Sequence, residues 1–189
     1  QDREGNAVQG AEVLFLSNMR LLEAGTTDAS GSLALQVPAD CRGWAVLARK
    51  SQLGFDYRTA ERGRSSKAEL HPLPDQLKLQ FDGARSVRVN TVDQNGKPVA
   101  GVKVGPWYIR KPGYEADINL SGVPTLMSAT DAKGVADLDW LPEKFEQSLP
   151  IMSQSDEYYA REHASAIQAE KPASEVDSGL SQMTWTPRS

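Results

Sequence analysis

Residue types that perform nucleophilic or metal-dependent chemistry are scarce in this chain of 189 residues. A catalytic triad needs a histidine beside a serine or cysteine, and an acid that orients the histidine. His71 and His163 are the only histidines and Cys41 is the only cysteine. His71 precedes a proline and His163 lies in a polar stretch, so we expect both at the surface, outside any metal-ligand spacing. The sequence predicts no catalytic triad, no metal site and no cofactor.

Three aspartates begin Asp-x-x-Gly segments, which resemble part of a calcium loop. They are Asp28, Asp93 and Asp131. A calcium loop needs several oxygen ligands, whereas each segment offers one carboxylate, so we expect each aspartate to accept hydrogen bonds from its own turn. Asp137 and Asp139 are candidates for the paired carboxylates of a glycosidase. Their alternation with Leu138 instead places both on a solvated strand face, and the chain is predicted not to be an enzyme.

The segment from Gly105 to Asp117 is unusual because it gathers three aromatic and two basic side chains. Exposed aromatic rings can stack on sugars or anchor a protein partner. The candidate ligand-binding residues are Trp107, Tyr108, Arg110 and Tyr114. In the alternative interpretation, Trp107 and Ile109 continue a strand while the two tyrosines cover the edge of the core. The exposure of the rings distinguishes the two interpretations.

An internal repeat organises the elements that must position these residues. Asp2, Gly5, Val8, Gly10 and Val13 recur as Asp93, Gly96, Val99, Gly101 and Val104, each displaced by 91 positions. The run Thr27–Gly31 recurs as Thr130–Gly134, displaced by 103 positions. The second copy therefore carries about 12 additional residues between Val104 and Thr130.

Apolar runs typical of strands surround the repeated turns, most clearly Leu33, Leu35 and Val37 at strict period two. The predicted strands are 33–37, 45–48, 77–81, 86–92, 135–140 and 183–185. The segment 157–171 is interpreted as a long loop, with or without one helical turn. Copy one has no counterpart of the strand 86–92, so we expect that its opening strand belongs to a chain continuing upstream.

Both copies contain Asp-x-x-Gly-x-x-Val-x-Gly-x-x-Val, followed by Thr-Asp-Ala-x-Gly-x-apolar-x-Leu and a Leu/Val-Pro stop. This signature resembles the carboxypeptidase regulatory-like domain, a transthyretin-like relative of the immunoglobulin-like sandwiches. The match is strong over 2–50 and 86–142 and weak over the last third of each copy. The resemblance implies a prealbumin-like or immunoglobulin-like sandwich, strung in tandem in bacterial, planctomycete-like envelope or secreted proteins, without catalytic activity of its own.

The predicted fold is all-β, with two tandem antiparallel β-sandwiches of the immunoglobulin-like or prealbumin-like type. The predicted domains are 1–83 and 84–189, with an insertion at about 105–126. The predicted function is a non-catalytic spacer or interaction module of a larger extracytoplasmic bacterial protein, which is periplasmic, cell-surface or secreted. The alternative is a carbohydrate- or peptide-binding module that uses the aromatic segment of the second domain.

Charge and hydropathy limit the partners. The net charge of −4 is spread over both halves, so neither half is a polycation and nucleic acid is not an expected partner. No stretch approaches the ~18 apolar residues of a membrane span. The expected partners are other domains of the same polypeptide, or a protein or glycan of the cell surface.

Overall fold

The computed structural model of the chain describes residues 1–38, 41, 43–60, 72–146 and 148–154, and the backbone of strands 158–160, 166–168 and 181–187. Regular structure in these residues is almost entirely β-strand, apart from the 3-10 turn η1 (Pro124–Leu126). The predicted all-β fold, built from antiparallel sheets, is confirmed. No helix in the described part of the chain has the length and apolar character needed to cross a membrane.

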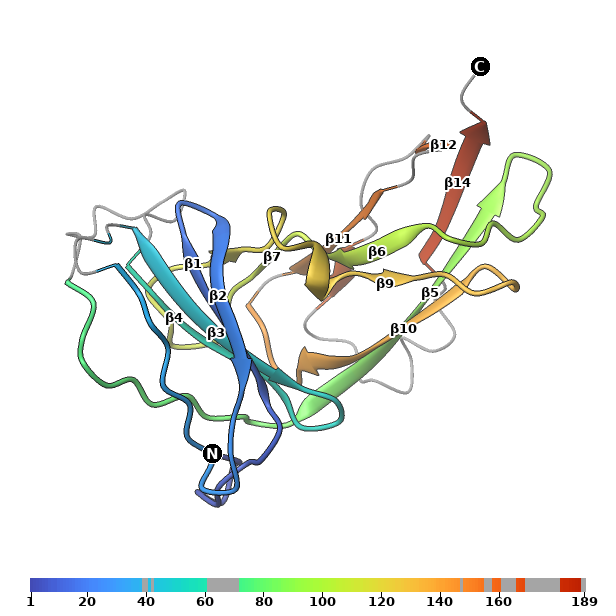
Figure 1. Cartoon of the computed structure of the whole chain (residues 1–189). Helices are drawn as coiled ribbons and strands as arrows, with labels where there is room; N and C mark the ends of the chain where they lie inside the picture. Colours follow the sequence, from blue (N-terminus) through green and yellow to red (C-terminus); the bar gives the residue numbers. More distant parts are fainter. Residues whose placement is uncertain are drawn as a thin grey trace.

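The first repeat contributes one four-stranded antiparallel sheet, in the order β2-β1-β3-β4 (Figure 1). Its strands are β1 (Glu12–Ser17), β2 (Arg20–Thr26), β3 (Trp44–Lys50) and β4 (Gly54–Thr59). Strands β1 and β3 are apolar on both faces, with Leu14 and Leu47 on one side and Phe15 and Val46 on the other. Such two-sided apolar strands need cover on both faces of the sheet.

The second repeat forms two four-stranded sheets and a small hairpin. In order, one sheet contains β10 (Val135–Pro142), β5 (Ala84–Asp93), β14 (Ser181–Pro187) and β12 (Tyr158–Ala160). The other sheet contains β13 (Ala166–Gln168), β11 (Ser148–Gln154), β6 (Lys103–Pro106) and β9 (Ser128–Ala129). The hairpin pairs β7 (Tyr108–Ile109) with β8 (Ile118–Asn119). Strand β14 runs parallel to β5, and the other strand pairs described in this repeat are antiparallel. Val89, Val104 and Leu138 are fully buried in the core of this repeat.

Three sequence-based expectations are corrected. Residues 33–37 and 77–81 belong to no strand, because alternating apolar residues indicate a buried face but do not supply a hydrogen-bonding neighbour. Within 157–171, interpreted as a loop, the strands β12 and β13 occur. His71 and His163, which are predicted to lie at the surface, are outside the described part of the chain.

One hydrophobic core runs through both repeats. On one face of the first sheet, Leu14, Leu47 and Phe55 belong to the same buried cluster as Val89 and Trp140 of the second repeat. A separate cluster, containing Phe15 and Val46, lies on the opposite face of the first sheet. The two repeats are therefore packed on each other through one face of that sheet, with Phe55 and Trp140 rings 5.6 Å apart between centroids.

Candidate functional site

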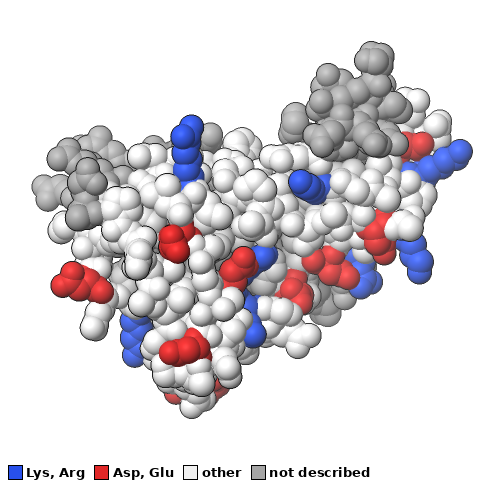
Figure 2. All heavy atoms as spheres, in the orientation of Figure 1, with Lys and Arg blue, Asp and Glu red and all other residues white. Residues whose placement is uncertain are grey.

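Charged side chains of both signs are interspersed over the visible surface (Figure 2). No single-sign patch gathers on that face of the described residues, consistent with the small net charge. The described residues contain no group of three or more histidine, cysteine, aspartate or glutamate side chains that could hold a metal ion.

The repeated Asp-x-x-Gly segments form the same turn in both copies. The Oδ1 atom of Asp28 accepts hydrogen bonds from the backbone N–H groups of Ser30 and Ser32, at 2.8 and 3.0 Å. Asp131 accepts from the N–H groups of Lys133 and Val135 at 2.8 and 2.9 Å. The predicted role of these aspartates in capping their own turns is confirmed.

These hydrogen bonds also favour the ionised carboxylates. The pKa of Asp28 is lowered chiefly by its bond from the Ser30 hydroxyl, and the pKa of Asp131 chiefly by its bond from the Val135 N–H. The pKa of Asp93 is lowered in the same way by the Lys97 N–H. The turns thus use their single carboxylates for local structure.

The insertion of the second repeat covers one face of the first sheet. Ile109 and Ile118 of the β7–β8 hairpin and Leu126 of η1 are buried in the shared core. A hydrogen bond joins the same two surfaces, because Nη2 of Arg49 in β3 donates to the backbone carbonyl oxygen of Thr125 at 2.8 Å. The residues that distinguish copy two from copy one are therefore used to bind copy one.

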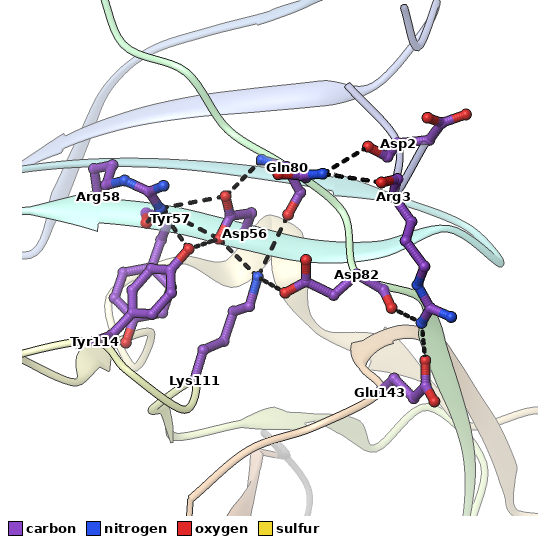
Figure 3. Close-up of polar contacts among 10 residues, drawn as sticks. All are labelled: Asp2, Arg3, Asp56, Tyr57, Arg58, Gln80, Asp82, Lys111, Tyr114 and Glu143. Carbon is purple, nitrogen blue, oxygen red and sulfur yellow. Dashed lines mark hydrogen bonds and ion pairs between the residues drawn. The ribbon is translucent and has the colours of Figure 1, made fainter. Parts of the chain in front are cut away.

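At the centre of this contact, Lys111 of the insertion forms a buried ion pair with Asp56 of β4 (Figure 3). The Lys111 Nζ atom lies 2.8 Å from Asp56 Oδ1, and the two side chains are 3% and 0% exposed. The same ammonium group lies 2.6 Å from Oδ2 of Asp82, whose side chain is half exposed. Lys111 of the second repeat is thus held between the carboxylates of Asp56 and Asp82, which both lie within residues 1–83.

Further donors satisfy the buried Asp56 carboxylate. The Tyr114 hydroxyl donates to Oδ1 at 2.5 Å, and the Gln80 backbone N–H donates to Oδ2 at 2.6 Å. Arg58 lies 3.3 Å from Oδ2 and also places its guanidinium 4.9 Å from the centre of the Tyr114 ring. Every group in this cluster has a fixed partner, so the arrangement is suited to locking two surfaces in one orientation.

The ionisation of the cluster follows from burial and from Asp56. Burial works to lower the pKa of Lys111, but the charge of Asp56 and hydrogen bonds to Asp56 and Asp82 outweigh burial and raise it. The pKa of Tyr114 is raised by burial and by its hydrogen bond to Asp56. Burial also raises the pKa of Tyr57, whose hydroxyl donates to the Ala116 carbonyl at 2.6 Å. Lys111 is therefore charged and both tyrosines are neutral near neutral pH.

The four candidate ligand-binding residues lie in two different environments. Tyr114 packs against the shared core and joins the Asp56 cluster, and Arg110 pairs with Glu146 at 2.9 Å. Trp107 is 38% exposed, and its ring lies 6.2 Å from the ring of Tyr108. The rings of Trp107 and Tyr108 are the two that lie side by side, and ligand binding by them stays a prediction.

Sequence reasoning did not identify Lys111 and Asp56 as partners. Lys111 follows Arg110 in a segment whose aromatic and basic side chains predict ligand binding, and 55 positions separate it from Asp56. One signal was present: Asp56 stands between two aromatic residues, Phe55 and Tyr57, in the strand β4. A carboxylate in such a run is expected to need a buried partner.

Comparison with known proteins finds distant structural similarity. No family model and no curated protein sequence matches the chain. The shaft pilin SpaA from Lactobacillus rhamnosus GG is similar over 98% of this chain and 91% of the pilin, with 11% identity and a TM-score of 0.38. The Bacillus anthracis TIE protein is similar over 90% of this chain and 30% of its own, with 12% identity and a TM-score of 0.32.

Proposed function

We propose that the chain is a non-catalytic structural spacer or interaction module of a larger extracytoplasmic bacterial protein, in which two carboxypeptidase regulatory-like repeats act as one rigid body. The observation that carries this proposal is the buried Lys111–Asp56 pair within the shared core. Domains joined by a small polar interface move relative to each other by default. A large apolar interface that also contains a satisfied ion pair supports a fixed orientation instead.

Several peripheral contacts support the same function. Arg3 of the first repeat pairs with Glu143 of the second, and Gln52 donates its N–H to the Asp139 carbonyl at 2.9 Å. Arg49 places its guanidinium 5.1 Å from the centre of the Trp140 ring. All three contacts reach residues 139–143, at and just after the end of β10, so they hold this part of the second repeat against the first.

Nuclear spin relaxation of the ¹⁵N-labelled chain tests the proposal. One rigid body gives a single rotational diffusion tensor that fits the amides of β1–β4 and those of β5, β6, β10 and β11 together. The Arg88→Met variant controls for the loss of an ion pair that does not join the repeats, because the pair of Arg88 with Asp137 is exposed and lies within the second repeat. It should keep the single diffusion tensor. Separate diffusion tensors for the two repeats of the unmodified chain would refute a rigid spacer.

The alternative function, carbohydrate or peptide recognition, is favoured by one observation, the exposed Trp107 beside Tyr108. A glycan array compares the chain with Trp107→Ala, which removes an exposed ring and leaves the Asp56 cluster intact. Binding that disappears in the variant supports recognition through this ring. Absence of binding by both proteins favours the spacer.

A further inference from the structure

The second face of the first sheet lies at the bottom of a groove of about 530 Å³, whose lining combines apolar side chains with polar groups. Phe15 and Val46 form part of its floor, and the segments 32–38 and 73–81, which belong to no strand, form its walls. Both wall segments are drawn without arrows in Figure 1, where they run beside the sheet. Leu33 and Leu77 on these walls are 36% and 37% exposed, so apolar surface in the groove faces solvent.

In the second repeat, a strand occupies the corresponding space. Strand β10, the counterpart of 32–38, pairs antiparallel with β5, and β14 pairs parallel with β5 on its other side. Val87 and Val89 of β5 are 3% and 0% exposed. Leu138, the counterpart of Leu35, is fully buried there, whereas Leu35 is only partly buried. The groove in copy one thus lies where the central strand β5 lies in copy two, with 32–38 on one side in the position of β10.

The backbone at Gln1 fixes the direction of that strand. The amino group of Gln1 donates to the Leu79 carbonyl at 3.0 Å, and the Phe81 N–H donates to the Gln1 carbonyl at 3.0 Å. This is the hydrogen-bond pattern of a parallel pair between Gln1 and Gln80. A displacement of 91 places Gln1 at the position of Val92, which pairs parallel with Thr184 in the second repeat.

We propose that this groove is a strand-acceptor site, filled by an extended peptide segment joined to the amino side of Gln1. The segment runs parallel to 77–81 and antiparallel to 32–38, and places apolar side chains at alternate positions on Phe15 and Val46. Strand addition supplies backbone hydrogen bonds to both walls, while the groove selects the alternate side chains. The proposal is independent of the spacer function, because it concerns the other face of the first sheet.

A fusion tests the proposal with the chain's own strand. The sequence of residues 84–91 is placed directly ahead of Gln1, which puts the counterparts of Val87, Val89 and Thr91 toward the groove. The matched control inserts one glycine between that peptide and Gln1. Because side chains alternate between faces, a shift of one residue turns the apolar set toward solvent.

We expect the in-register fusion to raise the melting temperature and to slow amide exchange of residues 33–37 and 77–79, on the order of tenfold or more, relative to the control. Equal melting temperatures and equal exchange in the two fusions would overturn the proposal. Sedimentation equilibrium of the unextended chain provides a second arm. A dimer that protects these same amides would assign the groove to a second copy and would also overturn it.

Discussion

The two repeats share their turns and the framework of one sheet, but they complete their cores differently. In both copies an aspartate, Asp28 or Asp131, caps the turn that precedes the run 33–37 or the strand β10. In both copies a threonine hydroxyl also donates to a valine carbonyl, from Thr27 to Val8 and from Thr130 to Val99. The second repeat covers its β6–β11 sheet with β5, β10 and β14. The first repeat has one face of its sheet covered by the neighbouring repeat and leaves a groove on the other.

This difference shows that similar local sequence specifies similar turns without specifying what covers a sheet. The insertion around Lys111 covers copy one, although in the sequence it belongs to copy two. A repeat is thus a unit of sequence, whereas the core is a unit of packing. Substitutions at equivalent or matched positions of the two repeats separate local sequence from packing.

The largest effect is expected from Lys111→Met, which removes the buried ion pair between the repeats. The variant leaves the fully buried Asp56 carboxylate without its ammonium partner, and breaking a buried pair in this way costs about 3–5 kcal/mol of unfolding free energy. Urea denaturation followed by tryptophan fluorescence measures the loss.

Arg88→Met is the matched control, since its pair with Asp137 has a similar distance, 2.9 Å, but both side chains are more than half exposed. We expect a loss of only about 0–1 kcal/mol there. The double variant Lys111→Met/Asp56→Asn, which removes both charges, should recover part of the loss. Similar losses in the two single variants would show that burial of the Lys111 pair has no special importance.

Equivalent leucines compare the filled and unfilled cores directly. Leu138→Ala, at a fully buried position, is expected to lower the unfolding free energy by about 2–5 kcal/mol. Leu35→Ala, at the same place in copy one, removes a side chain that solvent already reaches, and a loss below about 2 kcal/mol follows. In the in-register fusion the loss for Leu35→Ala should increase toward that for Leu138→Ala. An unchanged loss would mean that the added peptide does not cover Leu35.

Local structure was predictable from the sequence to a greater extent than packing was. The turns at Asp28 and Asp131 and the strand at Ala45–Ala48 follow from residue type and short-range spacing, and all are confirmed. The run at 33–37 has the same local pattern as β10 but no strand beside it, so local pattern alone gave a wrong prediction. Pairing depends on residues far away in the chain.

The candidate site was predictable only in part. The unusual composition around Trp107 indicated that the insertion has a special role, but not that Lys111 supplies it. A basic residue beside another basic residue is normally solvated, and its burial here depends on the distant Asp56. The tertiary position of Asp56 is set by β3–β4 pairing, which no short window of sequence contains.

Alkaline pH should destabilise the contacts on the face of the first sheet that the second repeat covers. Lys111, Tyr114 and Tyr57 all have raised pKa values in the folded chain. A raised pKa contributes stability that is fully present below the unfolded value, about pH 10, and is lost as pH rises through the folded value. Melting temperatures between about pH 8 and about pH 11 should therefore fall less steeply for Tyr114→Phe. Parallel curves for the variant and the parent would contradict this assignment.

The smallest effect is expected where the repeats are most alike, at the capped turns. Asp28, Asp93 and Asp131 have lowered pKa values, so their contribution to stability is present above the unfolded value, about pH 4, and is lost as pH falls through the folded values. Replacing all three by asparagine keeps an oxygen that accepts the turn hydrogen bonds but removes the titration. Near neutral pH the melting temperature should change little, while its decrease below about pH 4 should become shallower. Both carboxylates accept two backbone N–H groups, and Asp28 accepts the Ser30 hydroxyl in addition, so the single Asp28→Asn variant should have an effect at least as large as that of Asp131→Asn. A larger effect at Asp131 would show that the filled core beside it strengthens the turn.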